Sequence, residues 1–198
     1  MEIVGISGAS CSGKSTLAAS LKKHIGSKCQ IILIDNYYFP SDLSFDERAM
    51  INHDLPTAHD WNLLNEHIKI LKQGFPVESP VYSYREHNRA VDTITIYPPE
   101  VLVIEGIHAL HKPGILKHLT IKVFLDSSPN VRKQRRIKRD LSERSGDIEH
   151  VLTKFCTQTE PTFKQFESLL KSHADIVTDD LLFAESQIIS LTKQKNRS

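Results

Sequence analysis

Apolar residues gather in short, nearly uninterrupted runs along the first two thirds of the chain, at residues 3–7, 31–34, 101–104 and 121–125. Runs that are apolar at almost every position are typical of strands buried on both faces of a parallel sheet. Between the first two runs lie a glycine-rich loop and then residues 15–25, where apolar side chains recur at helical spacing. The order strand, loop, helix, strand predicts a βαβ unit.

Two further patterns predict a helix and a hairpin in the middle of the chain. Asp60 can cap a helix that runs to Gln73, with Gly74 at the position where helices often end. Residues 81–84 and 93–97 are short, alternating, and rich in β-branched and aromatic side chains. They predict a hairpin-like excursion around the polar residues between them.

The last third of the chain is mainly helical in pattern. Ser128 and Pro129 form a typical helix start, and the helix that follows is dense in Arg and Lys. Residues 147–171 predict more helix, with a break at Pro161, before a last short strand at residues 176–177. We therefore expect a single domain over residues 1–198, with an excursion at 80–98.

Composition excludes several classes of protein. The chain of 198 residues is 39% hydrophobic and 25% charged, with a net charge of +1, which disfavours a dedicated nucleic-acid binder. Three cysteines without a C-x-x-C pair indicate neither a disulfide framework nor a zinc site. No signal peptide or transmembrane run is evident. These features predict a cytoplasmic protein without a membrane or nucleic-acid partner.

The glycine-rich loop carries a phosphate-binding pattern. Its residues fit G-x-x-x-x-G-K-[ST] at every fixed position, between a strand and a helix as that motif requires. Glycines let backbone amides surround phosphates at a helix N-terminus. Lys14 would reach the β- and γ-phosphates, and the Ser15 hydroxyl would ligate Mg²⁺. The predicted nucleotide-binding residues are Gly8, Ala9, Ser10, Cys11, Ser12, Gly13, Lys14, Ser15 and Thr16.

These elements predict an α/β fold of the P-loop NTPase type, with a parallel sheet of about five strands, helices on both faces and a small β-hairpin excursion. Ligands of such sheets lie beyond the carboxyl ends of the strands. Asp35 and Glu105 stand at two such ends. Asp35 is placed to accept a proton from an acceptor hydroxyl, and Glu105 to hold Mg²⁺. The alternative is that each carboxylate only begins a turn.

The Arg- and Lys-rich helix has two interpretations. It is either a solvated or nucleic-acid-binding face, or a lid over residues 135–147 whose cations neutralise charge on the transferred phosphoryl group. The near-neutral total charge favours the lid. His108 and His111 have the spacing of metal ligands but no evident Cys or carboxylate partner, and we interpret them as a surface pair. Trp61 is expected in the core.

Several blocks in order resemble the uridine kinases, the uridine–cytidine kinase branch of the P-loop kinases. The blocks, which lie within residues 3–177, are GASCSGKST (8–16), IDNYY (34–38), NHDLPTAHD (52–60), PVYSYREHNR (80–89), VLVIEGI (101–107), FLD (124–126) and RRIKRDLSER (135–144). The resemblance implies ATP-dependent (or GTP-dependent) phosphorylation of the 5′-hydroxyl of uridine or cytidine, as in pyrimidine salvage, with Mg²⁺. It also implies a homo-oligomer, a tetramer or a dimer.

The same resemblance implies roles for individual residues. Asp35 would be the general base, and Asp54 would bind the ribose hydroxyls with Arg136 near the same sugar. A pyrimidine site would be formed by Tyr82, Tyr84 and His87. Arg139 and Arg144 would act on the phosphates. The chain departs from the family pattern at His53, Leu55, Gly146 and Lys154, which predicts an altered acceptor site.

Two other functions remain open from the residues alone. One is a related P-loop kinase that acts on another small alcohol, such as a different riboside or a sugar phosphate. The other is a non-catalytic nucleotide-binding switch. Switch proteins usually place D-x-x-G at a strand end to sense the γ-phosphate, and no such string follows the strand ends here. This absence favours the enzyme.

Overall fold

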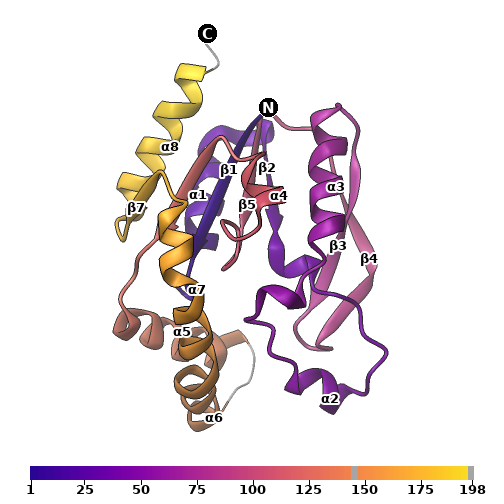
Figure 1. The fold of residues 1–198 in the computed structure, drawn as a ribbon, viewed down its shortest axis with the longest axis vertical. Coiled ribbons are helices and arrows are strands. Elements are labelled where there is room, and N and C mark those ends of the chain that lie inside the picture. Colours follow the sequence, from indigo (N-terminus) through magenta and orange to yellow (C-terminus); the bar gives the residue numbers. More distant parts are fainter. Residues whose placement is uncertain (144–146, 196–198) are drawn as a thin grey trace.

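The computed structural model describes residues 1–143 and 147–195 and is built around a parallel sheet. Its five strands lie in the order β2-β5-β1-β6-β7, and every pairing is parallel. The strands are β1 (Glu2–Gly8), β2 (Cys29–Leu33), β5 (Val101–Glu105), β6 (Ile121–Leu125) and β7 (Ile176–Thr178). Because all of them run the same way, their carboxyl ends meet at one edge, at the lower end of the sheet in Figure 1.

Helices cover both faces of this sheet. Alternate residues of β1 and β5 point to opposite faces, so that Ile3 and Ile104 join one buried cluster and Val4 and Val103 join the other. The first cluster includes side chains of α3 (Trp61–Lys72), α4 (Pro113–Leu116) and α7 (Glu160–Ser172). The second includes side chains of α1 (Lys14–Ile25) and α8 (Leu181–Lys195). The α/β fold class predicted from the sequence is confirmed.

A two-stranded antiparallel sheet stands apart from the main one, as the sequence predicts. Its strands, β3 (Val77–Ser83) and β4 (Asn88–Ile96), are longer than expected. Most of β4 is exposed, so its sequence shows no continuous alternation. Residues 34–60 hold a helical turn at Ile34–Tyr37, helix α2 (Phe45–Met50) and a second turn at Pro56–Ala58.

The basic helix and the helices after it extend beyond the strand ends. They are α5 (Pro129–Glu143), α6 (Ile148–Lys154) and a π-helical turn (Phe155–Thr159) that leads into α7. Pro161, expected to break a helix, lies in the first turn of α7. The helix is not broken there: α6 continues through the π-helical turn into α7, and the change to π-helical hydrogen bonding comes just before Pro161. In Figure 1, α5 and α6 lie on one side of the strand ends and α2 with the hairpin on the other.

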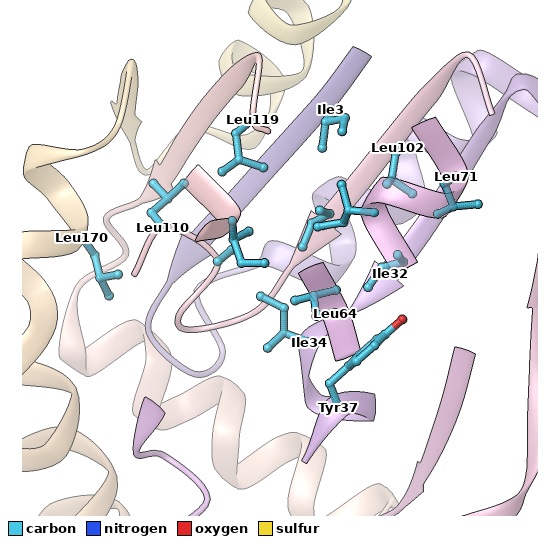
Figure 2. Close-up of a cluster of buried hydrophobic side chains, with 14 of the residues drawn as sticks. Ile3, Ile32, Ile34, Tyr37, Leu64, Leu71, Leu102, Leu110, Leu119 and Leu170 are labelled. Carbon is cyan, nitrogen blue, oxygen red and sulfur yellow. The ribbon is translucent and has the colours of Figure 1, made fainter. Parts of the chain in front are cut away.

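The larger buried cluster connects α3 to the strand ends that carry the site. Leu64 of α3 and Ile34, just after β2, are both fully buried, and Figure 2 shows them next to each other. Tyr37 lies in the same cluster, and its hydroxyl forms a 2.9 Å hydrogen bond with Nδ1 of His67. The segment that carries Asp35 is therefore fixed by the core.

We predict that Leu64→Ala destabilises the protein by about 3 kcal/mol, because it removes transfer free energy and leaves a cavity in a packed cluster. Urea unfolding monitored by circular dichroism measures the change. Leu182→Ala is the control, since Leu182 is 78% exposed on α8, and its effect should stay within about 0.5 kcal/mol. Equal effects of the two substitutions would contradict this account of the core.

Candidate active site

The loop between β1 and α1 takes backbone conformations that suit glycine. Gly8 and Gly13 have φ angles of 145° and 108°, and Cys11 has a φ of 63°. A Cβ atom at Gly8 would lie 2.7 Å from the backbone oxygen of Leu125, a distance that real Cβ atoms do not adopt. The loop is therefore wound as tightly as the sequence motif requires, with its amides at the start of α1.

Positive groups converge on this loop. Lys14 is buried, and its Nζ donates to the backbone oxygen of Ala9 at 2.9 Å. Arg135 donates from Nη1 to the backbone oxygens of Cys11 and Ser12, each at 3.3 Å. The buried Oγ of Ser12 has no hydrogen-bond partner among the residues that the structure describes. Donors and cations around a loop of this shape fit the phosphates of a nucleotide.

Glu105 lies beside the loop because strand register places it there. It is the last residue of β5 and pairs with Ile6 of β1 and Leu33 of β2. Its carboxylate accepts a 2.8 Å hydrogen bond from Oγ of Ser15. A carboxylate beside a hydroxyl is a set of hard oxygen donors that fits Mg²⁺.

Glu105 and Lys14 titrate as buried neighbours. Burial raises the pKa of Glu105, and the positive charge of Lys14 opposes that shift. Burial likewise lowers the pKa of Lys14, against the pull of Glu105 and Asp35. In both groups loss of hydration is the larger effect. A dication held by Glu105 would favour its charged form.

Asp35 faces the same cleft from the neighbouring strand. The cleft has a volume of about 680 Å³, and its lining includes Lys14, Ser15, Asp35, Glu105 and Arg139. Asp35 lies in the helical turn after β2, and its Oδ2 accepts a 2.7 Å hydrogen bond from the hydroxyl of Tyr84. The structure thus brings the predicted base, the phosphate loop and the predicted metal ligands around one space.

The segment that carries Asp54 is held through its backbone. The amide of Asp54 donates to Oδ1 of Asn52 at 3.1 Å, and its carbonyl oxygen lies 2.8 Å from Nε2 of His108. Asn52 also accepts from Gln158 and donates to Thr162. The loop is therefore tied to the segment after β5, to the π-helical turn and to the start of α7.

Aromatic rings form a cluster next to this loop, with Tyr38 at its centre. The ring of Tyr38 packs against His53 at 4.7 Å, His59 at 4.4 Å and Tyr82 at 4.9 Å between centroids. Tyr82 is buried, and its hydroxyl lies 3.2 Å from Nε2 of His53. Sequence reasoning did not predict Tyr38 at the centre of this cluster, although the IDNYY block places it three positions after Asp35.

The remaining predicted residues lie around these groups. His87 ends the turn between β3 and β4 and packs edge-on to Phe45. Arg136 donates to Oγ of Ser10 at 3.2 Å and pairs with Asp140, so it contacts the phosphate loop. Arg139 lines the cleft and also pairs with Asp140. Arg144 lies outside the described residues.

Comparison with known proteins decides the family. The profile of the phosphoribulokinase / uridine kinase family matches residues 3–183. A uridine kinase from Cronobacter sakazakii is 40% identical over 185 residues, which cover 88% of this chain and 85% of that protein. A uridine kinase from Halobacterium salinarum is 35% identical over 193 residues, covering 97% and 85%.

The chain belongs to the phosphoribulokinase / uridine kinase family. The resemblance predicted from the sequence is confirmed, and the chain is a phosphotransferase of the P-loop class. This identification extends over the whole sheet and the basic helix, since the matched residues 3–183 include both. The nucleotide-binding loop is the part of the site that the family assignment itself implies.

Solved structures of kinases share the fold of this family member. A candidate fructose transport system kinase from Silicibacter sp. TM1040 superposes with a TM-score of 0.72 at 18% identity, over 89% of this chain and 88% of its own. D-glycerate 3-kinase from Cryptococcus neoformans var. grubii gives 0.58 at 16% identity, over 82% and 77%. At such identities the likeness concerns the fold alone, because one fold supports many acceptors.

The interpretation of His108 and His111 as a surface pair is wrong. His108 is 1% exposed. Its ring packs edge-on to those of His111 and Phe166, with 5.4 and 5.1 Å between ring centroids. The sequence signal was its position three residues after a buried strand, where the chain still crosses the core. Trp61 packs against the core as expected, and its Nε1 donates a 2.6 Å hydrogen bond to the backbone oxygen of Pro56.

Two of the residues that depart from the family pattern, His53 and Lys154, lie in or near the aromatic cluster. His53 packs on Tyr38, and its Nδ1 is buried without a partner in the described part of the chain. Burial lowers the pKa of the His53 imidazole, and the nearby charges of His87 and of Lys154, the last residue of α6, lower it further. Leu55 is half-buried. Gly146 lies outside the described residues.

Buried imidazoles make stability depend on pH. Burial lowers the pKa of His59 to about 4 and of His108 to about 3, from a usual value near 6.5. Below about pH 6.5 the unfolded chain binds protons at these positions that the folded protein does not bind. Their contribution to stability is therefore complete above pH 6.5 and decreases as the pH falls toward 4.

We predict that His59→Phe reduces the loss of unfolding free energy between pH 7.5 and pH 5.0, because one proton-linked position is removed. Urea titrations of the variant and the wild-type protein at both values measure it. Between pH 7.5 and 8.5 the difference between the two proteins should stay constant, since His59 is neutral in both states there. An unchanged loss at pH 5.0 would show that His59 is not buried as a neutral ring.

Proposed function

We propose that this protein transfers the γ-phosphoryl group of ATP to the 5′-hydroxyl of a pyrimidine nucleoside, uridine or cytidine. The observation that carries the proposal is the shared cleft, in which Asp35 faces the phosphate loop and the Ser15–Glu105 pair. The 35–40% identity to proteins named uridine kinase, over most of the chain, supports the nucleoside as acceptor.

Binding of the nucleotide rests on groups around the loop. Lys14 would move from the Ala9 carbonyl to the β- and γ-phosphates, and the loop amides would bind the remaining oxygens. Ser15 and Glu105 would hold Mg²⁺, which supplies positive charge to the phosphates when bound. Arg139 would add a cation from the basic helix, together with Arg144 by family resemblance.

The acceptor would enter between the hairpin and the strand ends. Asp35 would take the proton of the acceptor hydroxyl as the new O–P bond forms, and ADP would leave. Asp54 would bind the ribose hydroxyls with Arg136 near the sugar, and Tyr82, Tyr84 and His87 would surround the pyrimidine. The work of the protein is to position and to stabilise charge, with no covalent intermediate.

A coupled assay of ADP release tests the proposal. It compares uridine and cytidine with purine ribosides, with a sugar phosphate and with no added acceptor. We expect turnover with the pyrimidine nucleosides above all others. Turnover with a sugar phosphate but with none of the nucleosides would show that the acceptor is a sugar phosphate. ADP release that no acceptor stimulates would indicate the nucleotide-binding switch instead.

We predict that Lys14→Ala lowers kcat for uridine phosphorylation by about 100-fold or more, because the phosphates lose their buried cation. The coupled assay measures the loss. Lys23→Ala is the control, because Lys23 is exposed on the same helix and should leave turnover unchanged. Retention of more than about a tenth of wild-type kcat in Lys14→Ala would contradict the role given to this loop.

A second substitution separates proton transfer from binding. Asp35→Asn keeps the size of the side chain and removes the proton acceptor, and we predict a loss of kcat on the order of 10² to 10⁴ with nearly unchanged nucleotide affinity. Steady-state kinetics and equilibrium binding of ATP give the two quantities. Asp92→Asn, on the exposed part of β4, is the matched control. A normal kcat with weakened ATP binding would make Asp35 a binding residue.

A further inference from the structure

Tyr84 bridges the two sides of the cleft. It follows β3 of the hairpin, whereas Asp35 follows β2 of the main sheet, and both residues line the cleft. The hydroxyl of Tyr84 donates to Oδ2 of Asp35 at 2.7 Å. Tyr84 is 44% exposed, so this contact is not forced by burial in the core. The hydrogen bond is short and has a charged acceptor, which places it among the stronger ones in proteins.

The surrounding backbone fixes where this hydroxyl lies. The amide of Tyr82 donates to Oδ1 of Asn36 at 3.1 Å, and Arg89 of β4 donates to the backbone oxygen of Tyr37 at 3.1 Å. The ring of Tyr84 packs edge-on to Tyr82 at 5.3 Å between centroids. The hairpin is thus attached to the two residues that follow Asp35, and these contacts hold Tyr84 near the carboxylate.

The geometry points to Tyr84 as a positioning residue for Asp35, and we propose that its hydroxyl orients the carboxylate for proton abstraction. The inference rests on the proposed function, in which Asp35 is the base. A carboxylate on a single methylene can rotate, and a hydrogen bond to Oδ2 holds that atom in place. Among the described residues, no hydrogen bond engages Oδ1, which leaves that oxygen to accept the proton of the acceptor hydroxyl.

This role differs from the one that the family resemblance implies. A residue that recognises the pyrimidine acts through its aromatic face, whereas a residue that orients Asp35 acts through its hydroxyl. Tyr84→Phe separates the two, because it keeps the ring and removes only the donor. Ring recognition alone predicts no effect of this substitution. Orientation of the base predicts a loss in kcat with the binding of both substrates preserved.

The test is a double-mutant cycle with Tyr84→Phe, Asp35→Asn and the double variant. We expect Tyr84→Phe to lower kcat about tenfold, the scale of one hydrogen bond to a charged group, with KM for both substrates within about twofold. In the Asp35→Asn background the same substitution should cause no further loss, because the base it orients is gone. Tyr97→Phe, at an exposed tyrosine just beyond β4, is the control and should leave kcat unchanged.

Two results in Tyr84→Phe, and one in Asp35→Asn, would overturn the proposal. One is an unchanged kcat in Tyr84→Phe, and the other is a tenfold loss that recurs in the Asp35→Asn background, which would show that Tyr84 acts independently of the base. The cycle uses whichever hydroxyl acceptor the wild-type protein phosphorylates, so a failure of uridine as the acceptor is recognised before the cycle begins. Normal turnover in Asp35→Asn would remove the base assignment, and the role of Tyr84 would fall with it.

Discussion

The pairing of β1 with β5 on one side and β6 on the other determines where every group of the site lies. The three strands run parallel and in fixed register, so the phosphate loop begins one strand away from Glu105. A shift of one residue in either pairing would turn alternate side chains to the wrong face, and both buried clusters would be lost. The packed core therefore helps to hold Ser15 and Glu105 at the distance that their hydrogen bond spans.

The central part of the fold follows from local sequence because its strands are buried on both faces. Each apolar run became a strand of the main sheet, and the carboxylates after two of those runs now face the cleft. The phosphate loop could be predicted equally well, because its backbone angles are ones that residues other than glycine rarely adopt. In both cases the residues that impose the structure are neighbours in the sequence, so a local pattern is enough to predict it.

The acceptor side was harder to predict because it depends on contacts between distant segments. Most of β4 is exposed, so no hydrophobic pattern marks its length. Tyr38 became the centre of the aromatic cluster only because residues 53 and 59, from the connection before α3, and residue 82, from β3, pack against it. The burial of His108 likewise depends on packing against Phe166 of α7. The polar side chains that fill this region are mostly neutral aromatic rings, so the region is packed without a buried charge.

The ion pairs of α5 reduce the positive charge that its many arginines present to the cleft. Arg132 forms a two-pronged bond with Glu160 and lies over the ring of Phe163, which anchors the start of the helix to α7. Asp140 contacts both Arg136 and Arg139. Part of the positive charge is thus neutralised within the protein, and the electrostatic field that reaches the cleft is smaller than a count of cations suggests. Long-range attraction of nucleotides should consequently be weaker than the number of cations suggests, and salt should screen the part that remains.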